Sequence, residues 1–329
     1  MINKICKALS GKEILIFNFH RNSNPLVNPE TKKKYSFLNP HYLWKATALF
    51  GRDTKLRYKV MAGILSLIDP VAIIDINWTN KRHSLYFAWA KRKGKKFIVI
   101  QHGIYHGGII EDIREKYVKC TTFLVWGEHF RQMRERDNKG KNCEYIVYGN
   151  PVYNSYDRES FSYKEKAGNN ILVAVSVIEG VRLTKLYKFL HKLEDYGFHV
   201  TVKEHIKQAT KAEPIEGFEK SEENLYDLLK EQRYDCIITD VSSAMTDIAF
   251  FKNRAIYFSP DGEKKCQTEN VYEQYLVNIA MRNSFFTDRK DLLEQISIDA
   301  QEEMLEYLIR TEGTSNTLDE VLGKVKSEK

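Results

Sequence analysis

The chain has 329 residues, 43% of them hydrophobic and 29% charged, which is enough for two domains that each bury a core. No stretch approaches the roughly 20 consecutive apolar residues of a membrane-spanning helix, and the broken apolar stretch near the start does not predict a signal peptide. The five cysteines are scattered and form no CxxC pair. This pattern argues against a disulfide framework or a zinc knuckle and fits a reducing cytoplasm.

Charge divides the chain into two halves. Residues 1–160 hold 28 Lys and Arg against 14 Asp and Glu, a net charge of +14, whereas the rest of the chain carries −7. A basic first half predicts a phosphate-rich partner such as a membrane surface, a polyanionic acceptor or nucleic acid. The alternative is two ordinary solvated surfaces that differ in charge. Nucleic acid is disfavoured because the basic residues are not interleaved with aromatics in a recognisable module.

The first half alternates short apolar runs with stretches of helical spacing. Such runs are typical of strands buried in a parallel sheet, and the proline-bearing segment before residue 40 predicts an exposed loop. The predicted strands are 13–19, 71–76, 97–100, 122–126 and 145–148, and the helical patterns are 41–68, 85–91 and 128–137. This alternation predicts a doubly wound α/β domain over residues 1–156.

The pattern starts again after a polar segment without periodicity, residues 154–170, which predicts a linker between domains. The strands predicted beyond it are 171–177, 199–203, 236–238 and 255–258, with helices at 184–196 and 225–231, another after residue 243, and a helical tail at 288–326. We therefore expect a second Rossmann-like domain at 168–329. Two such domains imply a cleft between them.

A pair of serines follows one strand of the second domain, in TDVSSAMTD. Ligands of open parallel sheets bind at the carboxyl ends of strands. Ser242 or Ser243 can cap the next helix, whose first amides lack partners, so the pair predicts a phosphate-binding turn. Asp247, one turn into the helix, could accept hydrogen bonds from a sugar or polyol. A plain capping serine with a helical aspartate is the alternative, and the residues alone leave both open.

Histidines follow two other predicted strands. His102, in QHGIYHGG, could act as a general base on a hydroxyl, and Gly103 beside it would let a ligand approach the backbone. A histidine bonded to local backbone is the alternative. His106 lies four residues on, but the surrounding glycines argue against a helix and hence against a zinc site. No metal site is predicted.

Three further residues lie where predicted strands end. Lys203 and His205 follow the strand at 199–203 and could contact phosphate, although a surface histidine is the alternative. Asn150, in YGNP, ends the first domain's last strand and is expected to face the cleft. The chain lacks the GxxxxGK[ST], GxGxxG, GxSxG and DxD motifs, which counts against kinases, dehydrogenases and serine hydrolases, and no cofactor is predicted.

Four motifs in this order resemble the CDP-glycerol glycerophosphotransferase family: QHG, WGE, YGNP and TDVSSAMTDIAFFKNRAIYF. These bacterial enzymes of teichoic acid and capsule synthesis have the GT-B fold. The resemblance covers roughly residues 97–260, and SSxxxD is its most specific part. Similar serine pairs and histidine motifs occur in bacterial sialic acid and Kdo transferases of the same architecture, so the resemblance does not fix the donor.

The resemblance implies roles for individual residues. It makes His102 the base for the acceptor hydroxyl, Ser242 and Ser243 the phosphate contacts, and Asp247 the helix carboxylate. The family's second histidine usually precedes a proline. Its nearest match, His205, precedes an isoleucine, which leaves that assignment open.

We expect a metal-independent transferase that moves a glycosyl or polyol-phosphate group from a CDP-, CMP- or UDP-linked donor to a saccharide or lipid-linked acceptor. The chain is short for a polymerase of this kind, which favours single additions or one subunit of a larger system. The expected location is the cytoplasm, with peripheral association at the inner membrane face if the basic half meets lipid. The alternatives are a nucleotide-sugar epimerase or hydrolase, which needs no acceptor, and a non-catalytic polyanion-binding protein.

Overall fold

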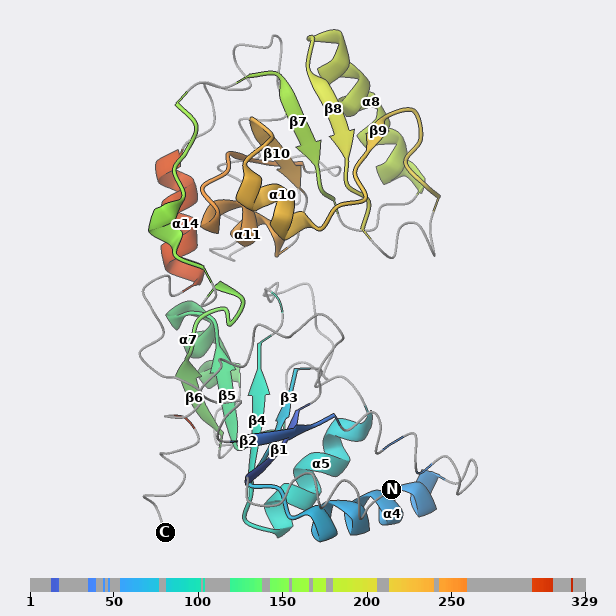
Figure 1. Cartoon of the computed structure of the whole chain (residues 1–329), viewed down its shortest axis with the longest axis vertical. Coiled ribbons are helices and arrows are strands. Elements are labelled where there is room, and N and C mark those ends of the chain that lie inside the picture. Colours follow the sequence, from blue (N-terminus) through green and yellow to red (C-terminus); the bar gives the residue numbers. More distant parts are fainter. Residues whose placement is uncertain are drawn as a thin grey trace. The chain divides into compact units, whose positions relative to one another are not determined.

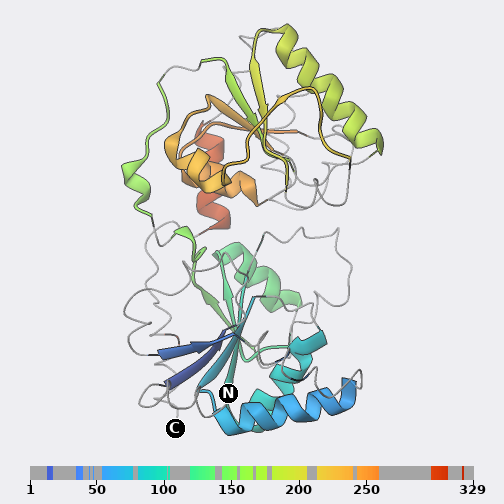
Figure 2. The same ribbon diagram turned by 45° about the vertical axis from the view of Figure 1, so that its right-hand side comes forward.

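A computed structural model describes residues 13–17, 35–39, 44, 47, 54–76, 81–101, 103, 119–137, 143–153, 156–165, 168–175, 180–205, 213–239, 243–258, 298–309 and 321. The chain divides into two compact units: Met1–His102, Ile110–Tyr156 and Glu312–Lys329 form the first, and Gly103–Ile109 and Asp157–Thr311 form the second. Each unit contains a parallel β-sheet flanked by helices (Figures 1 and 2). The predicted α/β class with two Rossmann-like domains is therefore confirmed.

The described part of the first unit forms a six-stranded parallel sheet in the order β2-β1-β3-β4-β5-β6. Strands β3 and β5 are buried along their whole length and β4 at every position except Lys96, as expected of a sheet covered on both faces. Helix α5 packs on β3 and β4, and α7 packs on β5 and β6. The bounds are β1 Glu13–Phe17, β2 Tyr35–Leu38, β3 Ala72–Asp75, β4 Lys96–Ile100, β5 Thr122–Val125, β6 Glu144–Val147, α4 Thr54–Ile68, α5 Lys81–Arg92 and α7 Glu128–Asp137.

Strand β2 lies where the sequence predicts an exposed loop. It pairs with β1 at the edge of the sheet, and only Tyr35 of its four residues is fully buried. An edge strand needs fewer apolar residues than a central one, so the hydrophobic signal there is weak. The turn between α5 and β4 is formed at Gly94, whose φ of +61° suits glycine.

The last residues of the chain return to the first unit. Val321, 2% exposed, packs in the same cluster as Ala72, Ile98 and Leu124 of the central strands. The sequence-based division assigns the whole tail to the second domain, so this part of the division needs correction. Within the predicted tail the structure describes a helix at Ile298–Leu308 (α14), and the apolar pattern of the tail does not reveal which of the two sheets it will cover.

The second unit has a five-stranded parallel sheet in the order β11-β10-β7-β8-β9. Numbered within the unit, this is the Rossmann order 3-2-1-4-5. Helix α8 covers one face through Leu183, Leu186 and Leu190, while α10 and α11 lie on the other side (Figure 1). The bounds are β7 Asn170–Val173, β8 His199–Val202, β9 Glu219–Lys220, β10 Cys236–Thr239, β11 Ala255–Tyr257, α8 Gly180–Asp195, α10 Leu225–Glu231, α11 Ala244–Phe250 and α14 Ile298–Leu308.

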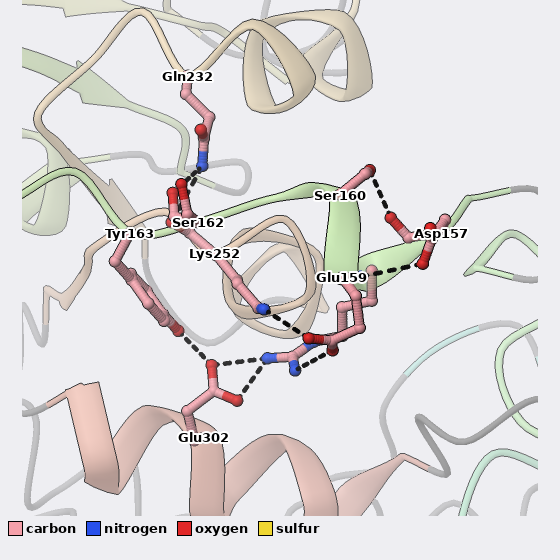
Figure 3. Close-up of polar contacts among 9 residues, drawn as sticks. Asp157, Glu159, Ser160, Ser162, Tyr163, Gln232, Lys252 and Glu302 are labelled. Carbon is pink, nitrogen blue, oxygen red and sulfur yellow. Dashed lines mark hydrogen bonds and ion pairs between the residues drawn. The ribbon is translucent and has the colours of Figure 1, made fainter.

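The segment predicted as a linker is packed against the second unit. It includes a short 3₁₀ helix, η4 (Arg158–Ser160), and Figure 3 shows its side chains reaching α14 and the turn after α11. Nη2 of Arg158 lies 2.6 Å from Oε1 of Glu302, and the Tyr163 hydroxyl donates to the same carboxylate. Polar side chains without periodicity therefore hold this segment in place, which explains why hydrophobic patterning does not detect it.

Candidate functional site

The topological switch point of the second unit lies between β10 and β7, its two central strands. From this point the chain continues to opposite sides of the sheet, and ligands of open α/β sheets bind outside the carboxyl ends of the strands that flank it. The N–H of Ala174 donates to the Ile238 carbonyl at 2.8 Å, which holds these two strands together up to their carboxyl ends. The loops that follow, residues 176–179 and 240–242, lie outside the described residues.

Ser243 is the first described residue after β10 and stands immediately before α11. It already has helical dihedral angles, and its half-buried side chain makes no capping hydrogen bond. Its carbonyl accepts a hydrogen bond from the Thr246 hydroxyl at 2.7 Å. The plain-cap alternative therefore does not describe Ser243. Its partner Ser242 lies outside the described residues.

Asp247 points into the second unit. Its side chain is 8% exposed, and Oδ1 accepts a hydrogen bond from the hydroxyl of Tyr226 on α10 at 3.1 Å. Every residue of α11 is buried, so this short helix is an internal element of the fold. Asp247 thus links α11 to α10, and its role as a donor ligand stays a prediction.

Thr239, the last residue of β10, is a polar residue at the switch point that the sequence analysis did not select. Its side chain is fully buried, and its hydroxyl has no hydrogen-bond partner among the residues that the structure describes. Strand alternation places it on the face opposite Cys236 and Ile238, which pack under α8. Buried hydroxyls in native proteins nearly always have partners. The signal in the sequence was a threonine at the end of an otherwise apolar strand.

Lys203, Glu204 and His205 follow β8. The Lys203 N–H donates to the Val173 carbonyl at 2.8 Å, so strand pairing continues to this residue. Lys203 is half-buried and His205 exposed. Glu204 has a structural role that the sequence did not reveal: Oε1 accepts from the N–H of Ile215 at 2.6 Å and lies 3.2 Å from Nζ of Lys220.

In the first unit, Gln101 joins the carboxyl ends of β4 and β5. Its side-chain oxygen accepts from the Trp126 N–H and its carbonyl from the Trp126 indole N–H, both at 2.9 Å. Gln101 is 2% exposed, so both bonds are sheltered from water. His102, next in the chain, lies outside the described residues. This fixed glutamine determines where the histidine loop begins.

The structure shows the local surroundings of two further predicted site residues, Gly103 and Asn150. A Cβ at Gly103 would meet no atom within 4 Å, so packing does not require glycine there. Asn150 is 4% exposed, and Oδ1 accepts from the Val152 N–H at 3.1 Å. Asn150 therefore shapes the turn after β6, next to Gly149 with its φ of +85°. Its predicted contact with a ligand stays a prediction.

Neither a metal site nor a membrane span is found in the part of the chain that the structure describes. No group of three or more His, Cys, Asp and Glu residues there could hold a metal ion. Among the same residues, no helix is long and apolar enough to cross a bilayer.

The chain resembles solved structures in fold, although no family model and no curated protein matches it. Staphylococcus aureus MnaA with UDP has 11% identity and a TM-score of 0.56, over 96% of this chain and 97% of that chain. Neisseria meningitidis UDP-GlcNAc 2-epimerase bound to UDP-GlcNAc has 11% identity and a TM-score of 0.57, over 97% of this chain and 100% of that chain. A variant of the wall teichoic acid polymerase TagF has 10% identity and a TM-score of 0.52, over 96% and 90%.

These likenesses define the fold. The chain has the two-domain α/β architecture of the GT-B type, and it shares this fold with MnaA, the UDP-GlcNAc 2-epimerase and the TagF variant. At identities of 10% and 11% the likeness establishes the fold and leaves the reaction open.

Proposed function

We propose that the protein is an enzyme that uses a nucleotide-activated donor, and that it transfers a glycosyl or polyol-phosphate group to an acceptor hydroxyl. The observation that carries this proposal is the position of the Ser242–Ser243 turn, which follows β10 at the switch point of a Rossmann-ordered sheet. It is supported by fold likeness to proteins whose structures contain UDP or UDP-GlcNAc.

The donor binds to the second unit. The Ser243 hydroxyl is not used to cap α11, and Lys203 extends the neighbouring strand on the other side of β7. Hydroxyls and an ammonium group are suitable donors for the phosphates of a nucleotide diphosphate or monophosphate. We assign Ser242, Ser243 and Lys203 to this phosphate, with His205 and Asp247 as further donor contacts. UDP, CDP and CMP are the nucleotides to test first.

The acceptor is activated by His102. The imidazole takes the proton of the acceptor hydroxyl, whose oxygen then attacks the donor's anomeric carbon or phosphorus. The bond to the nucleotide phosphate breaks, and the serine hydroxyls stabilise the charge that develops on it. Gln101, the residue before His102, is held in place by its two hydrogen bonds with Trp126. Gly103 and Asn150 complete the acceptor side of this proposal, which needs no metal ion.

A nucleotide-sugar 2-epimerase is the second candidate, because two of the similar structures contain UDP or UDP-GlcNAc and one of them is a UDP-GlcNAc 2-epimerase. An epimerase needs no acceptor. Incubating the protein with UDP-GlcNAc alone and following the sugar by NMR separates the two reactions. A second epimer without any acceptor would establish the epimerase, whereas donor consumption that depends on an added saccharide or lipid-linked acceptor would establish the transferase.

We also propose that the protein is cytoplasmic and associates with an anionic membrane through the first unit. Helix α4 exposes Leu56 and Leu67, 41% and 65% accessible and about three turns apart, together with Lys55 and Lys59. Exposed apolar side chains beside cations suit an anionic lipid surface. The fraction of protein that sediments with phosphatidylglycerol vesicles should be lower for the double variant Leu56→Ser/Leu67→Ser than for the wild type. The control Val181→Ser, which changes a residue 72% exposed on α8, should leave it unchanged.

Nucleotide binding gives the direct test of the donor site. A thermal-shift screen of the full chain with UDP, CDP, CMP, GDP and ADP should show one or two nucleotides that raise the Tm, because a ligand of the native state stabilises it by mass action. The double variant Ser242→Ala/Ser243→Ala should bind that nucleotide about tenfold more weakly or worse. Ser160→Ala removes an exposed hydroxyl of η4 in the same unit and serves as the control. Equal affinities in both variants would refute the assignment.

A further inference from the structure

Two cysteines that the sequence separates by 23 positions lie side by side in the first unit. Sγ of Cys120 and Sγ of Cys143 are 2.8 Å apart. We propose that they are a redox modification site, which closes to a disulfide on reaction with a small-molecule disulfide such as oxidised glutathione. This inference is independent of the proposed enzymatic activity.

The sheet brings the two sulfur atoms together. Cys120 stands just before β5 and Cys143 just before β6, two neighbouring parallel strands. The N–H of Glu144 donates to the Thr121 carbonyl at 2.9 Å, and the register pairs Thr122 with Glu144. The backbone ladder therefore fixes both cysteines. A disulfide has an S–S distance of about 2.05 Å, so the sulfurs need to move closer by less than about 1 Å.

The two thiols differ in access and acidity. Cys120 is 3% exposed, whereas Cys143 is half-buried, so a reagent reaches Cys143 first. The hydrogen bond from Cys120 lowers the pKa of Cys143, and the Tyr145 side chain adds to this effect. The same contact, together with burial, raises the pKa of Cys120. Because the thiolate is the nucleophile, Cys143 is the attacking residue and Cys120 the resolving one.

The reaction proceeds in two exchanges. The Cys143 thiolate attacks one sulfur of oxidised glutathione, forms a mixed disulfide and releases one glutathione thiolate, which takes up a proton. Cys120 then loses its proton to solvent and displaces the second glutathione from Cys143. Two protein thiols are oxidised to one disulfide, and one glutathione disulfide is reduced to two thiols, so atoms and electrons balance. In a reducing compartment such a bond is transient, as cytosolic disulfides usually are.

Closing the bond should stabilise the first unit. β6 lies at the edge of the six-stranded sheet, and a cross-link to β5 restricts the unfolded chain. For a closed loop of this length the entropic estimate corresponds to a rise in Tm of about 5 to 10 °C for a domain of this size. The amino ends of β5 and β6 would then no longer separate on partial unfolding.

The experiment treats the folded, full-length protein with oxidised glutathione in a Cys6→Ser/Cys266→Ser background. We expect intact mass to fall by two hydrogens, peptide mapping to join Cys120 to Cys143, the Tm to rise, and dithiothreitol to reverse each change. Cys143→Ser should prevent all of these changes. Cys236, fully buried in β10, should stay reduced as the internal control.

Two outcomes would overturn the proposed redox site, and a third would overturn its stabilising role. One is a lasting glutathione adduct on Cys143 that does not resolve. Another is a pair of thiols that react no faster than Cys236. The third is a disulfide that forms but leaves the Tm unchanged, which would disprove the stabilising role.

Discussion

Nη2 of Arg158 lies 2.6 Å from Oε1 of Glu302, although 144 residues separate them in the sequence. Arg158 belongs to the segment by which the chain enters the second unit, and Glu302 to α14, the last described helix of that unit. The Tyr163 hydroxyl donates to the same carboxylate. One partly buried carboxylate therefore joins a polar segment to a helix that the sequence places far away.

Replacing Glu302 should destabilise the second unit. In Glu302→Gln the Arg158 guanidinium, whose side chain is 15% exposed, loses its close charged partner and keeps the exposed Glu159 carboxylate, 3.9 Å away. We expect the free energy of unfolding to fall by about 2 kcal/mol, the range for hydrogen bonds to charged groups. Glu306→Gln, an exposed position one turn later on α14, is the matched control and should change stability by less than about 0.5 kcal/mol. Urea denaturation measures both variants.

Tyr163 should make stability sensitive to alkaline pH. Burial and then the hydrogen bond to Glu302 raise the pKa of Tyr163 well above its ordinary value. Above about pH 10 the unfolded chain loses this proton while the folded chain keeps it. The stability that Tyr163 provides is therefore complete below that pH and falls as pH rises. The gap in unfolding free energy between wild type and Tyr163→Phe should shrink above about pH 10. A constant gap would contradict this.

Gly168 has no room for a larger side chain. A Cβ there would lie 2.5 Å from Oδ2 of Asp235, a carboxylate held by the Asn170 N–H at 2.9 Å and by Nζ of Lys164 at 3.1 Å. Gly168→Ala must displace this carboxylate, and we expect a loss of about 1 to 3 kcal/mol. Gly63→Ala is the control, because a Cβ in that helical position meets nothing within 4 Å. Equal Tm values for the two variants would refute this explanation.

Thr239→Val tests whether the unpartnered hydroxyl at the switch point serves a ligand. Valine keeps the shape of the side chain and removes a buried polar group without a partner. Stability without ligand should therefore stay the same or rise by about 1 kcal/mol. The affinity for the nucleotide found by the thermal-shift screen should fall several-fold. If Thr239→Val is more stable than the wild type and binds the nucleotide equally well, the Thr239 hydroxyl is only a destabilising buried polar group and not part of the site.

Gln101 should matter for turnover as well as for folding. Gln101→Met leaves the buried Trp126 N–H without its acceptor, which should cost about 1 to 3 kcal/mol. If His102 is the base, the rate of transfer should also fall, because the start of its loop is no longer fixed. Trp126→Phe keeps the backbone bond to the Gln101 side chain but removes the indole contact and part of a buried ring, so the Tm should fall while the rate of transfer changes less than in Gln101→Met. The comparison uses single-turnover rates and Tm values.

Much of the architecture follows from the sequence alone. The runs at 72–75 and 236–239 are nearly continuously apolar, which is required of strands buried on both faces, and their alternation with helices implies parallel pairing. Helices α7 and α10 have the predicted bounds, because a polar face or a capping residue marks where each begins. Ser243 stands at the start of α11, as the same local pattern predicts, and the role of the serine pair stays a prediction.

Other features required the tertiary structure. Hydrophobic periodicity says that a strand is buried but not which strands lie beside it, so only the sheet order puts the Ser242–Ser243 turn at a switch point. The contact of Asp247 with Tyr226, the pairing of Cys120 with Cys143 and the return of Val321 to the first unit each join distant positions. A short apolar or polar stretch could pack against many other parts of the chain. The packing of the whole chain selects one of these contacts, because each buried group needs a particular neighbour.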